Sequence, residues 1–502
     1  MTLTAESSQL EPPRKSRLSS ETVATVIARE IVGKVNRRLS RMRYGYLIDY
    51  VIANYLDLHA QLTDAQYEQI AWVDNTHQTN EMAVVPSPPQ LSSIQQRRIL
   101  ARLNCLHLLR QGNDASYVTF TQAQKEELKL AKEQFDTLSV LIRDLTPMEY
   151  DMLWLATTTA VSVTASQAAK EADPLHQEPS FDAVNFLAET MTKYPRIYPA
   201  AVELFAKYSP VGIEDGFSAM FATGQLRHMM YTEGGPNMFE KLKQGIQTKT
   251  LDDRSYNLWF AYWLIDITGF RGHLDSRGSL YLDKNTFQVL LCLKSVLDEF
   301  RGGLQQGSDP SPIGVLRKYL AARAAMVGLV ADETAGLFAT ETPRLILARI
   351  AAMLRLFTPE EGCQLQAGLS ALQKKVGDSV YRNLIAICDP LRDSDEPTPT
   401  FGPALFSNLK EKVGIAQAVE YALPIYATAL SKYGELRKEE KLPKDLPLNL
   451  NSLASKTSIE NILAGIPLPE IEINPKTGQA QLTAVCIEHT LVTSDQTLLL
   501  RT

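Results

Sequence analysis

Apolar residues recur at steps of three and four positions along most of this chain, which is the pattern of amphipathic α-helices. The first such face begins behind Ser19 and Ser20, and its members are Val23, Val26, Ile27, Ile31, Val35, Leu39 and Met42. The same spacing predicts further helices at 94–109, 121–144, 147–171, 181–193, 199–208, 216–230, 252–268, 283–301, 313–330, 343–357, 359–388 and 409–439.

Prolines and glycines interrupt this pattern and mark the predicted loops. Residues 84–93 hold three prolines in four positions, a run that a helix interior or a central strand does not tolerate. Residues 302–312 are rich in glycine, 389–403 are acidic and proline-rich, and 441–451 carry two more prolines. We therefore expect irregular segments at these four places.

The periodicity changes from helical to alternating near the C-terminus. Residues 470–473 alternate polar and apolar side chains, and 474–478 supply residues that favour a turn. Residues 481–487 and 491–500 are rich in Thr, Val and Leu. Together these segments predict a β-hairpin or a three-stranded meander.

The fold class predicted from these elements is mainly α, a multi-helical array of two helical regions with a small C-terminal β-hairpin or meander. The chain of 502 residues is long enough for several domains. The predicted segments are a disordered N-terminus at 1–20, an N-terminal helical segment at 21–83, a central helical domain at 94–301, a second helical region at 313–440, and the hairpin segment at 455–502.

Charge and cysteine content narrow the function classes. The chain has 51 Lys and Arg against 57 Asp and Glu, a net charge of −6, which argues against nucleic acid as the partner. The five cysteines are widely spaced and form no CxxC pair, so neither a disulfide framework nor a cysteine-rich zinc site is expected. The uncharged run 152–169 carries several Thr and Ser and reads as a buried helix. We expect a soluble, cytoplasmic protein without a transmembrane span.

One polar loop, at 269–282, stands between two very apolar predicted helices. Asp266 is the only charged residue of 258–267, and an unpaired carboxylate in a buried helix would be costly. The loop that follows brings Arg271, His273, Asp275 and Arg277 close to Asp266 in sequence. The simplest interpretation is a structural charge network, in which an arginine neutralises Asp266.

A metal site is a second interpretation of the same loop. His228, Asp266, His273 and Asp275 are ligand types that helical phosphohydrolases use to hold a divalent metal and activate water. The sequence has no HExxH motif, and no adjacent His-Asp pair at a helical position. This interpretation therefore depends on the four side chains converging in the fold.

Anion binding is a third interpretation. Arg227, Arg271 and Arg277 can form a basic pocket, because a guanidinium matches a phosphate or carboxylate with two parallel hydrogen bonds. Such a pocket would hold a phosphorylated or otherwise anionic small molecule.

The first predicted helix has a basic face. Arg37 and Arg41 are four residues apart, and so are Lys34 and Arg38. A basic amphipathic helix of this kind can contact a protein partner or, as a peripheral membrane contact, anionic lipid. The alternative is an ordinary solvated face.

Two function classes follow from these features. The first is a helical interaction protein that binds a partner, and the second is an enzyme or ligand-binding domain for an anionic small molecule centred on the polar loop. Substrate, partner and oligomeric state have no signature in the sequence.

Overall fold

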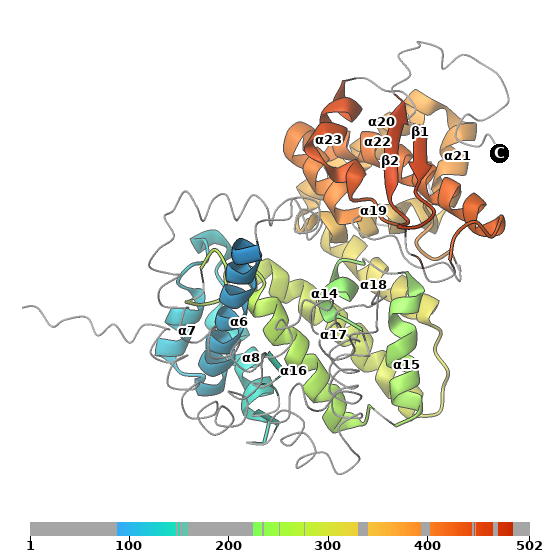
Figure 1. Ribbon diagram of the computed structural model, residues 1–502. Helices are drawn as coiled ribbons and strands as arrows, with labels where there is room; N and C mark the ends of the chain where they lie inside the picture. Colours follow the sequence, from blue (N-terminus) through green and yellow to red (C-terminus); the bar gives the residue numbers. More distant parts are fainter. Residues whose placement is uncertain are drawn as a thin grey trace, which may run out of the picture. The chain divides into compact units, whose positions relative to one another are not determined.

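The computed structural model describes residues 88–146, 224–232, 235–249, 251–275, 277–329, 340–392, 402–443, 448–464 and 470–484, with residues 149, 150, 153, 156, 157 and 446 (Figure 1). Of the interpretable residues, 72% are helical, and the sheet among them is one antiparallel pair of strands. The prediction of a mainly α fold with a small C-terminal hairpin is therefore confirmed. The expected strand at 491–500 lies outside the described residues, as do the expected helices at 181–193 and 199–208.

The chain forms two compact units that do not follow sequence order. Unit 1 takes its described residues from Ser93–Pro210 and from Thr268–Tyr281, and unit 2 from Val211–Ile267 and Leu282–Thr502, with 88–92. Whether the domain boundaries expected from the sequence delimit independently folding pieces stays a prediction.

The described residues of unit 1 form helices and the polar loop. Its elements are α6 (Pro88–Gln111, from Ser93 onward), α7 (Asp114–Thr121), η2 (Glu126–Leu128) and α8 (Lys132–Arg143). The prediction of a loop at 84–93 is wrong from residue 88 onward, because α6 begins at Pro88. Proline fits the first helical turn, where its missing N–H has no intrahelical acceptor.

The prediction of one continuous helix at 121–144 is also wrong in its first half. The chain turns after Thr121, whose carbonyl oxygen accepts from the N–H of Gln124, and the Gln124 side chain accepts from the N–H of Leu130 at 2.9 Å. A side chain that satisfies the backbone in this way competes with helix hydrogen bonds. The second helix, α8, therefore starts only at Lys132.

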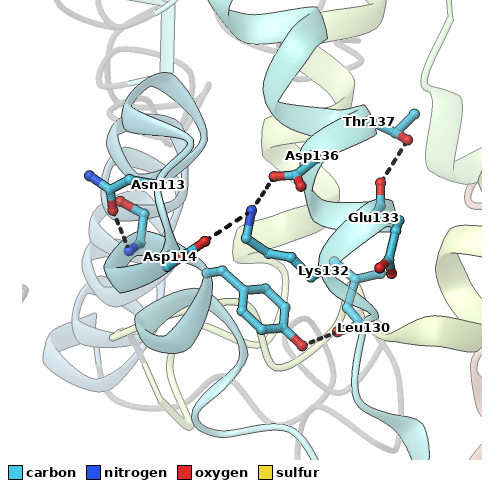
Figure 2. Close-up of polar contacts among 9 residues, drawn as sticks. Asn113, Asp114, Leu130, Lys132, Glu133, Asp136 and Thr137 are labelled. Atoms are coloured by element: carbon cyan, nitrogen blue, oxygen red, sulfur yellow. Dashed lines mark hydrogen bonds and ion pairs between the residues drawn. The ribbon is translucent and has the colours of Figure 1, made fainter.

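A lysine joins α7 to α8. Figure 2 shows Lys132 between two carboxylates, with its Nζ 2.5 Å from Asp136 and 3.4 Å from Asp114. The same Nζ lies 5.7 Å from the ring centroid of Phe135. The Asp136 hydrogen bond is the main cause of the raised pKa of Lys132. We interpret this cluster as a structural tie, because each of its charges has an opposite neighbour.

Unit 2 holds the remaining elements. They are α14 (Leu226–Met230), η3 (Pro236–Phe239), α15 (Glu240–Gln247), α16 (Asp253–Gly269, up to Ile267), α17 (Lys284–Gln305), α18 (Pro312–Met326), α19 (Glu341–Leu354), α20 (Pro359–Val376), α21 (Asp378–Ile387), α22 (Gly402–Lys438), η5 (Ser452–Ala454), α23 (Lys456–Leu463), β1 (Glu470–Ile473) and β2 (Ala480–Ala484).

Side-chain caps fix several helix starts in unit 2. The Asp283 carboxylate accepts from the N–H of Thr286 at 2.8 Å, as the sequence predicts for the start of α17. Thr358 and Glu361 form a reciprocal capping box at the start of α20. The single helix expected at 359–388 is wrong, because Gly377 adopts a φ of 79° and separates α20 from α21.

The long helix α22 packs against α19, α20, α21 and α23. Its backbone leaves helical geometry at Gly414, where φ is 82°. Among the described helices it alone has the length and apolar composition that a membrane crossing needs, and 44% of that apolar window is buried within the protein. A core helix of a soluble protein meets the same criterion, so this one helix is weak evidence for a membrane crossing.

The hairpin register agrees with the alternation in the sequence. Ile471 pairs with Leu482 and Ile473 with Ala480, and both isoleucines are buried. The turn is closed by the N–H of Asn474, which donates to the carbonyl oxygen of Gln479 at 2.9 Å. The predicted β1 is confirmed in full.

Candidate functional site

The start of the polar loop packs directly against α6 in unit 1. A Cβ atom added at Gly269 would lie 2.8 Å from the carbonyl oxygen of Arg98 and 2.8 Å from the backbone nitrogen of Arg102. These distances are shorter than real Cβ contacts, so only glycine allows the two backbones to approach this closely. The start of the loop is therefore fixed against α6.

The other end of the loop is fixed against α7. A Cβ atom at Gly278 would lie 2.4 Å from the carbonyl oxygen of Phe120. The N–H of Ser279 donates to that same carbonyl at 2.9 Å, and the Gln124 amide donates to the Ser279 carbonyl at 2.7 Å. The Ser279 hydroxyl donates back to the carbonyl of Thr268 at 2.8 Å. Backbone polar groups are therefore hydrogen-bonded at both ends of the loop.

The chemistry-bearing side chains of this region are buried. His273 is fully buried, and so is Cys105 of α6. Burial raises the pKa of the Cys105 thiol to about 12; a hydrogen bond with Thr268 opposes the shift and the negative charge of Asp275 adds to it. A thiol that stays protonated in the physiological range is a poor nucleophile.

The arginine and aspartate of the loop have local partners. The N–H of Arg277 donates to an Asp275 carboxylate oxygen at 2.9 Å, and the Arg277 guanidinium forms an ion pair with the same carboxylate. The Arg271 guanidinium lies 5.9 Å from the ring centroid of Tyr281, which packs against Phe270 at 4.9 Å. This arrangement favours the interpretation of the loop as a structural network.

The structure brings together only some of the residues proposed for a metal or anion site. Asp266 is half-buried on α16, and Arg227 and His228 lie on α14 of unit 2. Their convergence with His273 and Asp275 stays a prediction. Within the described part of the chain, no three His, Cys, Asp or Glu side chains are grouped to hold a metal ion. The basic face of Arg37, Arg38 and Arg41 lies outside the described residues.

A second cluster, at the C-terminal end of α19 in unit 2, has stronger features. We call Arg349, Arg355 and Lys410 the cationic cluster. The Arg355 Cζ lies 4.8 Å from the ring centroid of Tyr231, and Arg349 donates to the carbonyl oxygen of Thr232 at 3.3 and 3.4 Å. The Lys410 Nζ lies 3.5 Å from the carbonyl oxygen of Leu354. All three are half-buried.

Backbone strain is concentrated at this cluster. Four non-glycine residues of the described chain have positive φ, and two of them are here: Arg355 at 56° and Thr232 at 51°. An L-residue in this region costs about 1–2 kcal/mol, and for a β-branched residue such as threonine it is a true outlier. Strain of this kind collects at functional sites, where the surrounding structure holds it in place.

Arg355 adopts its left-handed conformation in the turn that ends α19. The N–H of Leu356 donates to Ala351 at 2.9 Å and the N–H of Arg355 to Ala352 at 3.2 Å, which is the Schellman pattern of helix termination. The left-handed residue of this pattern is usually glycine. Here it is an arginine, whose side chain belongs to the cationic cluster.

Further charged side chains lie near the cluster. Arg323, 1% exposed, donates to the carbonyl oxygen of Leu356 at 2.8 Å and adds a fourth cation. Two carboxylates, Glu361 and Glu411, are close enough to raise the pKa of Lys410, while burial, the largest cause, and Arg355 lower it. The net result is a lowered pKa for Lys410.

Local sequence patterns do not predict this cluster, because Lys410 lies on another helix, far along the chain from Arg349 and Arg355. One signal was present. Arg355 follows an apolar helix at the place where glycine or asparagine normally ends it. A bulky cation at that place indicates a role other than helix termination.

Comparisons of this chain with models of known protein families, with curated proteins and with solved structures found no match. The function is therefore argued from the residues of the two regions described above.

Proposed function

We propose that this protein is a helical binding protein that recognises an anionic group of its partner through the cationic cluster. The observation that carries the proposal is Arg355, a left-handed residue in a Schellman turn that normally takes glycine. Arginine at this left-handed position costs stability relative to glycine, and it places a guanidinium close to Lys410.

The chemistry of the cluster supports an anionic ligand. Half-buried charges interact more strongly than charges in water, because the local dielectric constant is lower. The ring of Tyr231 restricts the orientation of Arg355, so less side-chain entropy is lost when an anion binds. The hydrogen bonds of Arg349 and Lys410 are long and go to neutral carbonyls, so a charged acceptor would improve them.

The polar loop of unit 1 supports a structural role in this proposal. Its glycines and Ser279 hold α6 and α7 together, and its charges pair locally. An enzyme or ligand-binding site built from His228, Asp266 and His273 remains the alternative prediction. The buried thiols of Cys105 and Cys388, whose pKa values burial raises to about 12, are compatible with the cytoplasmic location that we also propose.

Fluorescence anisotropy with labelled acidic peptides tests the proposal. The probes are a glutamate-rich peptide and the same peptide with phosphoserines at alternate positions. We expect at least one of them to bind the full-length protein in a salt-dependent way. The variant Arg355→Gly should weaken that binding about tenfold, which corresponds to the roughly 1.4 kcal/mol expected for one charge-assisted contact.

The control variant is Arg382→Gln, which removes an exposed arginine of α21 outside the cluster. It has the same change in net charge as Arg355→Gly. The proposal is wrong if neither peptide binds, or if both variants weaken binding equally.

A further inference from the structure

The turn that follows α14 has a strained backbone. Thr232 is fully buried and has a φ of 51°, which is a true outlier for a β-branched residue. Its hydroxyl donates to the adjacent carbonyl oxygen of Tyr231 at 2.7 Å, so the side chain ties Thr232 only to its own turn. A conformation of this kind persists where the surrounding structure holds it, and it is typical of switch regions.

A side chain from another helix holds this turn. Arg349 of α19 donates to the carbonyl oxygen of Thr232 from Nε at 3.4 Å and from Nη2 at 3.3 Å. Both distances are longer than the usual N–H···O range of about 2.7–3.2 Å. A neutral carbonyl is also a weaker acceptor for a guanidinium than an anion is. The contact that fixes the strained residue is therefore one that an anion can replace.

We propose that Arg349 is a latch: it keeps the turn at Tyr231 and Thr232 in the strained conformation, and an anionic group that takes up its guanidinium releases the turn. This inference rests on the proposed function and adds a conformational response to binding. In the described part of the chain, no carboxylate lies within ion-pair distance of Arg349. The arginine is half-buried, so part of its side chain is open to solvent.

The rest of α14 is fixed without Arg349. The Trp259 indole donates to the carbonyl oxygen of Gly224 at 3.0 Å, before the helix. The Tyr319 hydroxyl donates to the carbonyl oxygen of Met230, the last helical residue, at 2.6 Å. Release of Arg349 therefore frees the turn and leaves the helix in place, which is a local opening and not an unfolding of unit 2.

Two opposing contributions set the population of the open turn. The left-handed backbone of Thr232 favours opening. The bond from Arg349 favours closing, because a buried carbonyl that loses its partner is costly. A ligand that pairs with Arg349 removes the second contribution and shifts the equilibrium toward the open turn.

Hydrogen exchange of the full-length protein, followed by mass spectrometry of fragments that end at residue 232, tests the latch. The N–H groups of Tyr231 and Thr232 are both hydrogen-bonded in the closed turn, so their exchange reports its opening. We expect Arg349→Gln to accelerate exchange of these two amides at least tenfold.

The matched control is Arg344→Gln, which removes another half-buried arginine of α19. Arg344 pairs with Glu341 on the same helix, and its loss should leave exchange in the turn unchanged. No acceleration in Arg349→Gln would overturn the inference. So would an equal acceleration throughout α17 and α20, because that would show a general loss of stability in unit 2.

Thr232→Asn tests the strain separately. Asparagine is close to threonine in size and adopts the left-handed conformation more readily, so exchange in the turn should slow several-fold. The variant that combines it with Arg349→Gln should exchange at a rate between those of the two single variants. Unchanged or faster exchange in Thr232→Asn would show that the turn stores no strain and would overturn the latch.

The acidic peptides of the binding experiment test the release. A saturating peptide should accelerate exchange of Tyr231 and Thr232 in the natural chain and have no further effect in Arg349→Gln. A peptide that binds and leaves these rates unchanged, or slows them, would overturn the inference and leave the proposed function intact. If neither peptide binds, the proposed function is wrong, and release by an anion is wrong with it.

Discussion

The polar loop of unit 1 and the cationic cluster of unit 2 both contain several charged side chains, but the partners of these side chains differ between the two regions. In the loop, Asp275 and Arg277 pair with each other and Ser279 bonds to the backbone of α7. In the cluster, Arg349 and Lys410 donate to backbone carbonyls, and Arg355 has a left-handed backbone conformation. A dense set of polar residues in sequence is therefore a weaker sign of function than cations kept at a cost in stability.

The largest expected effect concerns thiol reactivity and tests whether the loop stays closed. With a pKa of about 12, Cys105 should carry roughly 1 part in 10⁴ of thiolate at pH 8, and its reaction should accelerate only as the pH approaches 12. Exposed Cys363 should react with a disulfide reagent about a thousand times faster. Peptide mapping after timed labelling assigns each rate. Equal rates would mean that the loop opens readily and is not a fixed structural element.

The next largest effect concerns the close contact between Gly278 and α7. Gly278→Ala should destabilise the protein by about 2–3 kcal/mol, because its Cβ would meet the backbone carbonyl of Phe120 at 2.4 Å. Urea denaturation followed by circular dichroism measures this loss. Gly302→Ala is the control: nothing lies within 4 Å of its added Cβ, and alanine favours the helix by about 0.5–1 kcal/mol.

A smaller effect of opposite sign is expected in the cationic cluster. Arg355→Gly should raise the free energy of unfolding by up to about 1 kcal/mol, since relief of the left-handed strain exceeds the lost contact with Tyr231. The same denaturation experiment measures the gain. A loss of more than about 1 kcal/mol would show that Arg355 is held for stability, and the contrast between the two regions would disappear.

The smallest effects test the alternative metal site in the loop. Arg277→Ala should cost less than about 1 kcal/mol, because the pair with Asp275 is largely exposed on the arginine side. Addition of Mn²⁺ to the natural chain should leave its thermal midpoint unchanged. A stabilisation by Mn²⁺ that disappears in His273→Gln would instead favour the metal interpretation and weaken the comparison.

Local signals in the sequence were sufficient for much of the fold. Apolar periodicity located α16 and α17, and Asp283 marked the start of α17 because its short carboxylate caps the first turn. The alternation in 470–473 located β1. Proline misled the prediction at 84–93, since the same residue that breaks a helix interior also fits its first turn.

The candidate sites were less predictable because they depend on distant contacts and on backbone conformation. Nothing local reveals that Gly278 lies against α7, or that Lys410 lies near the end of α19. The positive φ of Thr232 and Arg355 results from the surrounding packing. The loop was recognised as unusual because its charges are close in sequence, and that same closeness lets them neutralise one another.

The division of the chain has a consequence for synthesis on the ribosome. Helices α6 and α7 emerge early, but the segment Thr268–Tyr281 that packs against both of them emerges much later, after α14, α15 and most of α16. Until then the backbone carbonyl of Phe120 lacks the N–H group that Ser279 supplies. A nascent chain paused before residue 281 therefore exposes an incomplete apolar surface, and we expect chaperones to bind it at this stage more than at any later one.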